Sequence, residues 1–97
     1  MPNAMRPIPP GEILQDELTE LDISASALSR ALKVPPNRIT GILNGARAIT
    51  ADTALRLARY FGTTAEFWLN LQQAYDLRSA EREAGKAIKR QVHPRAA

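Results

Sequence analysis

With 97 residues, 44% of them apolar and 24% charged, and a net charge of +3, the chain has the composition of one small globular domain. It has no cysteine, no secretory signal and no apolar run near the roughly 20 residues that span a membrane, so we expect a cytoplasmic protein without disulfides. A single histidine, His93, and the absence of a glycine-rich phosphate loop predict neither an enzyme nor a cofactor, metal or small-molecule ligand.

The first helix is predicted to begin near Glu12, directly after Pro9-Pro10-Gly11. Proline fits the first turn of a helix, and an acidic residue there interacts favourably with the helix dipole. The apolar face of this helix carries Ile13, Leu14, Leu18 and Leu21. Its other face is acidic and carries Asp16, Glu17 and Glu20.

Residues 24–45 carry the most informative pattern, two runs of helical apolar spacing separated by Pro35-Pro36. These prolines exclude one continuous helix but fit the first turn of a new one. We therefore predict a helix at 25–33, capped by Ser24, and another at 36–44, ended by the asparagine-glycine pair that follows. Two helices joined by a short turn predict a helix-turn-helix, whose second helix enters the major groove of DNA.

Two further helices are predicted after this motif, at 51–61 and 65–83. Thr50 and Thr64 are suitable caps for them, because a hydroxyl accepts a bond from the free backbone amides of a first turn. The residues of the fourth helix expected to face the core are Ala54, Leu55, Leu57, Ala58 and Phe61.

The domain organisation follows from these elements. Residues 1–8 are predicted to form an irregular lead, and residues 9–84 an all-α domain of five helices. Residues 85–97 are basic and contain a proline, so a disordered tail is expected there.

The exposed arc of the third helix is small and polar, whereas Ile39, Ile42 and Leu43 fall on the opposite face. Asparagine bonds adenine, arginine bonds guanine, and a threonine methyl meets that of thymine. A glycine within a helix costs about 1 kcal/mol, which a close approach to the groove wall would offset. The residues expected at base edges are Pro36, Asn37, Arg38, Thr40 and Gly41. The alternative is that they form only the polar surface of a capped helix.

The charge of the helix-turn-helix region also favours DNA. Residues 24–62 carry six basic residues and one acidic residue, a net charge of +5, whereas residues 1–23 carry −4. A basic surface of this kind neutralises phosphates, although basic residues also serve simply to solvate a surface. The residues expected to contact phosphates are Ser24, Ser26, Arg30, Asn44 and Arg47. For Asn44, ending its helix is the commoner role.

Three stretches of the chain resemble the HigA/VapI family of antitoxins within the larger Xre/Cro-like repressor superfamily. They are PIPPGEIL at 7–14, the helix-turn-helix at 24–45, and RAITADTALRLARYFGTTAEFWLNLQQAYDL at 47–77. The resemblance implies a five-helix, lambda-repressor-like fold and a homodimer that binds double-stranded operator DNA. It also implies a partner, a RelE/HigB-like toxin that cleaves mRNA on the ribosome, which the antitoxin neutralises while repressing their shared operon.

Two departures from the superfamily pattern weaken the expected DNA contacts. Ala25 stands where a phosphate-binding glutamine is frequent, and Pro35-Pro36 replaces a polar pair. Two other functions therefore stay open, a stand-alone Xre-like repressor without a toxin and a protein-interaction adaptor that has lost DNA binding.

The fifth helix is the expected dimer element, because aromatic residues are enriched at the centres of interfaces. The expected interface residues are Phe67, Trp68, Leu71 and Tyr75. The alternative is that Phe67 and Trp68 close the core of the monomer. A toxin that acts on RNA is expected to be basic, so the acidic face formed by Asp16, Glu17 and Glu20 is a candidate toxin-binding surface. The alternative is that this acidic face is only exposed to solvent and binds no partner.

Overall fold

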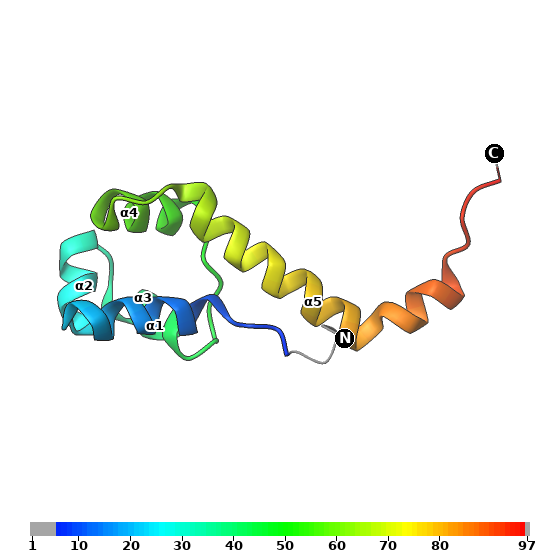
Figure 1. Ribbon diagram of the computed structural model, residues 1–97, viewed down its shortest axis with the longest axis horizontal. Helices are drawn as coiled ribbons and strands as arrows, with labels where there is room; N and C mark the ends of the chain where they lie inside the picture. Colours follow the sequence, from blue (N-terminus) through cyan, green and yellow to red (C-terminus); the bar gives the residue numbers. More distant parts are fainter. Residues whose placement is uncertain (1–5, 97) are drawn as a thin grey trace.

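Figure 1 shows a computed structural model that describes residues 6–96, so the first five residues of the predicted irregular lead lie outside the described part. Its helices are α1 (Pro10–Leu21), α2 (Ala25–Leu32), α3 (Pro36–Leu43), α4 (Ala51–Phe61) and α5 (Ala65–Gln91). Residues 6–96 contain no strand, and the all-α, five-helix prediction is confirmed.

Hydroxyl side chains begin three of the helices, as predicted from the sequence. The Oγ atom of Ser24 accepts a hydrogen bond from the amide of Ala27 at 3.0 Å, and Thr50 and Thr64 cap α4 and α5 in the same way. α1 and α3 instead begin with a proline in the first helical position, where the missing N–H has no helical partner to lose.

The turn between α2 and α3 depends on one left-handed residue, Lys33, with φ of 61°. The amide of Val34 then reaches back to the carbonyl of Ser29 at 3.0 Å, which closes the end of α2. Ser29 is buried, and its hydroxyl donates to the carbonyl of Ser26 at 2.8 Å. The two helices of the motif therefore meet at a fixed angle.

One core holds the first four helices and the beginning of α5 together. Its members are Leu14, Leu18, Leu28, Leu32, Val34, Ile39, Ile42, Ile49, Ala54, Leu57 and Trp68. The prediction that Leu55 belongs to this core is wrong, because its side chain is 63% exposed. α4 presents Ala54 and Leu57 to the core, and Leu55, one position from the first, points out of that face.

Gly11 permits the close packing of α1 on α3. A Cβ atom built on this buried residue would lie 2.1 Å from the carbonyl oxygen of Ile42, a contact with rigid backbone. Only a residue without a side chain fits, so the glycine that opens α1 fixes the distance between α1 and α3.

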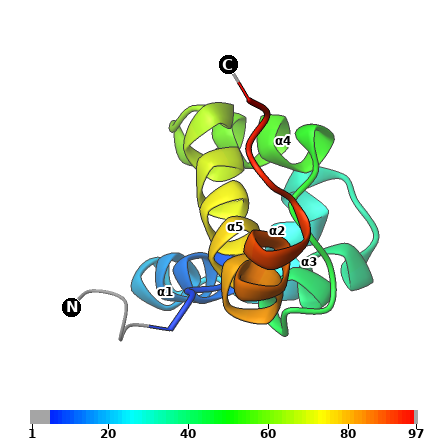
Figure 2. The same ribbon diagram turned by 90° about the vertical axis from the view of Figure 1, so that its right-hand side faces the viewer.

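α5 leaves the bundle and projects from it, and the molecule measures 52 × 27 × 22 Å (Figures 1 and 2). The prediction that this helix ends near Glu83 and that disorder begins at Gly85 is wrong, because the helix continues to Gln91. Good helix formers explain the difference, since alanine, glutamate, lysine and arginine dominate residues 80–90 around the single glycine. None of the described helices is both long and apolar enough to cross a membrane.

Candidate nucleic-acid interface

α3 presents a polar face to solvent over a closed core. Asn37, Thr40 and Asn44 are exposed, whereas Ile39 and Ile42 are buried beneath them. The hydroxyl of Thr40 donates to the carbonyl of Pro36 at 3.3 Å, within the helix. Asn37 and Thr40, which are proposed to read base edges, therefore lie on one exposed arc of α3, and Asn44 follows at the end of the helix.

Arg38, on the flank of that arc, is held by an ion pair. Its Nη1 atom donates to Oδ2 of Asp52 at 2.6 Å, and Nε of Arg56 donates to the same oxygen at 2.9 Å. Arg56 also donates from Nη1 to the carbonyl of Leu32 at 2.8 Å, at the end of α2. Hydrogen bonds from Arg56 and then from Arg38 hold the pKa of Asp52 below its usual value. This Arg38–Asp52–Arg56 cluster links all three helices of the region.

Gly41 lies beneath the side chain of Arg47. A Cβ atom at Gly41 would come within 3.1 Å of Cβ and 3.8 Å of Nε of Arg47. The amides of Ala46 and Arg47 both donate to the carbonyl of Gly41, at 2.8 and 3.0 Å. The absence of a side chain at Gly41 thus gives room for Arg47 beside α3, and a base contact by Gly41 stays a prediction.

Three of the residues predicted to bind phosphates, Ser24, Ser26 and Arg30, already have hydrogen-bond partners in α2. Nη1 of Arg30 donates to Oγ of Ser26 at 2.9 Å, while Oγ of Ser24 caps the helix. All three are exposed, so an anion has access to the N-terminus of α2. Asn44 has a local role, because its Oδ1 accepts from the amide of Ala46 at 3.1 Å.

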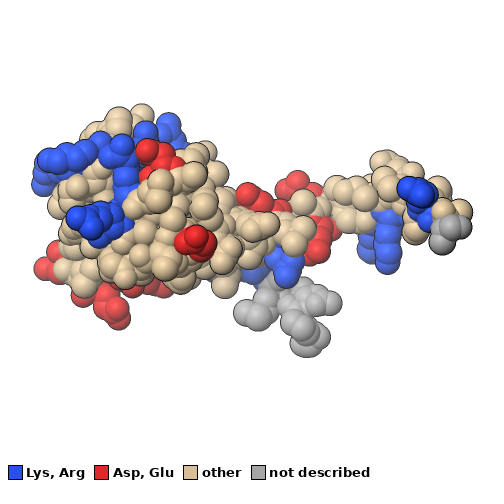
Figure 3. All heavy atoms as spheres, turned by 90° about the horizontal axis from the view of Figure 1, so that it is seen from above, with Lys and Arg blue, Asp and Glu red and all other residues tan. Residues whose placement is uncertain are grey.

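Basic and acidic residues occupy different parts of the surface. In Figure 3, Lys and Arg side chains gather over the upper left of the bundle and Asp and Glu along its lower left edge, while both kinds also occur along the projecting α5. On α1, Asp16 and Glu20 are exposed and Glu17 is half-buried, and none of the three forms an ion pair within residues 6–96. The acidic face is therefore available, and its use for toxin binding stays a prediction.

The predicted dimer residues do not all lie at a surface. Trp68 is 1% exposed, and its Nε1 donates to Oγ1 of Thr63 at 2.8 Å, so its placement in a dimer interface is wrong. The ring of Trp68 contacts Phe67 and Phe61 and closes the core of the monomer. Phe67 is 43% exposed, so part of its ring lies at the surface of the monomer, and its role in a dimer stays a prediction.

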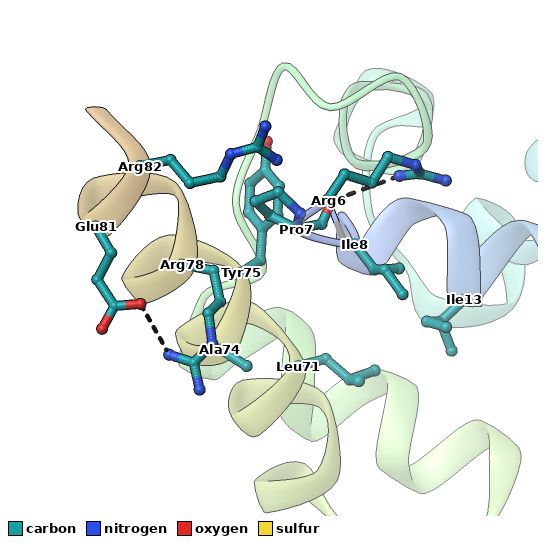
Figure 4. Close-up of a pocket in the computed structure, with 10 residues that line it drawn as sticks. All are labelled: Arg6, Pro7, Ile8, Ile13, Leu71, Ala74, Tyr75, Arg78, Glu81 and Arg82. Carbon is teal, nitrogen blue, oxygen red and sulfur yellow. Dashed lines mark hydrogen bonds and ion pairs between the residues drawn. The ribbon is translucent and has the colours of Figure 1, made fainter. Parts of the chain in front are cut away.

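Leu71 and Tyr75 line an apolar groove between α5 and the chain before α1, with a volume of about 810 Å³ (Figure 4). Ile8 and Ile13 face them across the groove, and Ala74 lies on the same side of α5. Arg78 and Arg82 of α5 also line the groove, and Arg78 pairs with Glu81 at 3.3 Å. An apolar groove on a projecting helix is a suitable surface for a second subunit.

Sequence reasoning missed two residues that organise this interface. Asp52 is the only acidic residue of residues 24–62, which was a usable signal, but its partner lies fourteen positions away along the chain. Gln72 joins α5 to the loop before α4, because its Oε1 accepts from the amide of Ile49 at 2.8 Å. No sequence pattern marks that contact.

The chain is similar in sequence to known helix-turn-helix proteins. The helix-turn-helix family model matches residues 14–68. The virulence-associated protein I of Dichelobacter nodosus is 56% identical over 82 residues, which are 84% of this chain and 76% of that protein.

Two solved structures are similar over nearly the whole chain. An addiction module antidote protein of the HigA family from Coxiella burnetii is 62% identical, with a TM-score of 0.91, and the match covers 94% of this chain and 100% of that one. The antitoxin HigA of Pseudomonas aeruginosa, solved with the higBA promoter, is 51% identical with a TM-score of 0.90 over the same shares. The resemblance predicted from the sequence is confirmed.

Proposed function

Because the chain belongs to the helix-turn-helix family and, within it, to the HigA antitoxins, we propose that it binds an operator in double-stranded DNA and neutralises the toxin of its own operon. Its family consists of DNA-binding antitoxins and transcription regulators and not of enzymes. We place the protein in the cytoplasm, because both DNA and a ribosome-dependent toxin are accessible there.

One observation carries the DNA-binding part of the proposal, the exposed polar arc of α3 above a buried core, in the fold of an antitoxin solved with its promoter. Fluorescence anisotropy with a duplex from upstream of the gene, and with a shuffled duplex of equal composition, tests it. We expect preference for the upstream duplex and an affinity that falls steeply with salt. The absence of measurable binding to either duplex, even at low salt, would favour the adaptor that has lost DNA binding.

A homodimer supports this function, because operators of helix-turn-helix proteins usually consist of two half-sites one helical turn apart. The groove beside Leu71 and Tyr75 is the surface we propose for the two-fold contact. A dimer fixes the separation of the two α3 helices, so the symmetry of the operator follows from the symmetry of the protein.

The toxin is proposed to be of the RelE/HigB-like, mRNA-cleaving type, and to bind the acidic face of α1. Charge complementarity supports this surface, since an RNA-cleaving protein carries basic groups. Co-expression with the neighbouring reading frame tests it, with growth and co-purification as readouts. The variant Asp16→Asn/Glu20→Gln should lose toxin binding, and the control Glu81→Gln/Glu83→Gln on α5 should not. Operator binding without any rescue of growth would favour a stand-alone repressor.

A further inference from the structure

The position of Asp52 in the basic region of the molecule is unusual. It is the only acidic residue among residues 24–62. It lies in the first turn of α4, and its carboxylate contacts Arg38 of α3. Oδ2 accepts from Arg38 at 2.6 Å and from Arg56 at 2.9 Å. A carboxylate beside a surface that is predicted to bind phosphates opposes DNA binding by its charge, so the position of Asp52 needs an explanation.

Asp52 is also bonded within its own helix, to Arg56. Arg56 reaches across it to the carbonyl of Leu32 at 2.8 Å and so joins α4 to the end of α2. The carboxylate therefore has a fixed position, and through it Arg38 has one. This ion pair employs only one of the donor atoms of Arg38, whose guanidinium carries five N–H groups.

Stabilisation of the fold alone is a weak explanation of the cluster. The side chain of Asp52 is 57% exposed and that of Arg56 40% exposed, and exposed ion pairs contribute little to stability. An acidic residue also interacts favourably with the helix dipole in a first turn, but this does not require contact with α3. What the geometry adds is a fixed orientation for one arginine at the start of α3, the part of a recognition helix that meets base edges.

We propose that Asp52 is a positioning residue for DNA recognition, which orients Arg38 toward a base edge and makes binding to random DNA less favourable. The proposal rests on the DNA-binding function proposed above. An arginine that is already held loses less side-chain freedom on binding its base. The carboxylate also repels phosphates, and only the contact of Arg38 with its correct base overcomes this repulsion. Binding to random DNA is therefore weakened more than binding to the operator.

Removal of the charge with Asp52→Asn tests this inference. The affinity for the operator should fall or stay level while the affinity for a shuffled duplex rises, so that their ratio drops roughly tenfold. Asp52→Glu keeps the charge and should retain most of the ratio. The control is Glu83→Gln on α5, which removes an exposed carboxylate outside the groove of Leu71 and Tyr75 and should leave the ratio unchanged.

A second experiment separates positioning from folding. In the Arg38→Ala background, Asp52→Asn should cause little further loss of the operator-to-shuffled ratio, because the group it orients is gone. A full additional loss would mean that Asp52 acts through Arg56 and the fold, and would overturn the proposal. Circular dichroism accompanies each variant, and Asp52→Ser, with a residue suited to a first turn, replaces Asp52→Asn if that variant unfolds.

The outcomes also separate this inference from the function on which it rests. Wild-type protein that does not prefer its operator contradicts the proposed function. Wild-type protein that prefers it, together with an Asp52→Asn variant of unchanged ratio, contradicts the positioning role alone. Equal losses of affinity for both duplexes would assign Arg38 to a phosphate and contradict it as well.

Discussion

The helix-turn-helix and the outer half of α5 use their side chains in opposite ways. In the motif and at the start of α4, polar groups are bonded to one another, as in the pairs Arg30–Ser26 and Arg38–Asp52, and most apolar groups are buried. In α5, large apolar residues such as Leu77 and Ile88 are about half exposed. The helix-turn-helix end is therefore organised before any partner binds, whereas α5 is an intact helix with exposed apolar surface.

Two glycines test the difference in packing most strongly. Gly11→Ala should destabilise the fold by about 3 kcal/mol or more, because its Cβ would lie 2.1 Å from the Ile42 carbonyl oxygen. Gly85→Ala is the matched control, since the nearest atom to its Cβ is 4.0 Å away, and it should stabilise by up to about 1 kcal/mol. Thermal and denaturant unfolding followed by circular dichroism measure both. Equal effects would show that α1 and α3 pack less tightly than described.

The apolar surface of α5 is tested by a charge at Ala74, an exposed residue of the groove. Ala74→Glu should weaken dimerisation roughly tenfold or more, because it places a carboxylate opposite its own copy in the groove and a pair with Arg78 offsets only part of that cost, while glutamate keeps the helix intact. Sedimentation velocity and operator affinity are the readouts. Ala80→Glu makes the same change on α5 outside the groove and should leave a dimer. A dimeric Ala74→Glu variant would place the interface elsewhere.

The helix-turn-helix end is tested by removal of Asn37, a side chain predicted to read a base edge. Asn37→Ala should weaken operator binding by roughly 1–3 kcal/mol and relax sequence preference, without loss of helical content. Gln91→Ala, which removes an exposed amide from the far end of α5, should have no effect on binding. Unchanged affinity in the Asn37 variant would remove this residue from the interface.

The smallest expected effect concerns Arg30, which we expect on a phosphate. Arg30→Ala should weaken operator and shuffled duplexes alike and lower the slope of log affinity against log salt by about 1 per subunit. Arg90→Ala removes an equal charge from the end of α5 and should leave the slope unchanged. A loss confined to the operator would contradict the phosphate role.

Local signals account for what the sequence predicted correctly. A capping hydroxyl acts within three residues, so Ser24, Thr50 and Thr64 marked the starts of their helices. Apolar periodicity is also a local signal, and it correctly predicted that Ile39 and Ile42 are buried in the core.

Features that depend on distant residues were not predictable in this way. The Arg38–Asp52 pair requires α3 and α4 to be placed first, and the use of Gly11 requires the distance between α1 and α3. Leu55 was assigned to the core because periodicity does not define how wide the buried face of a helix is. α5 passes Gly85 because the helix formers around it outweigh one glycine.

The burial of Trp68 has a practical consequence. It is the only tryptophan of the chain, its indole is enclosed in the core, and its N–H is bonded to Thr63. Its fluorescence therefore comes from a single, dry environment that water reaches only when the bundle opens. The emission of Trp68 therefore reports the folding equilibrium directly, and a labelled duplex added to the same sample reports DNA affinity as a second optical signal.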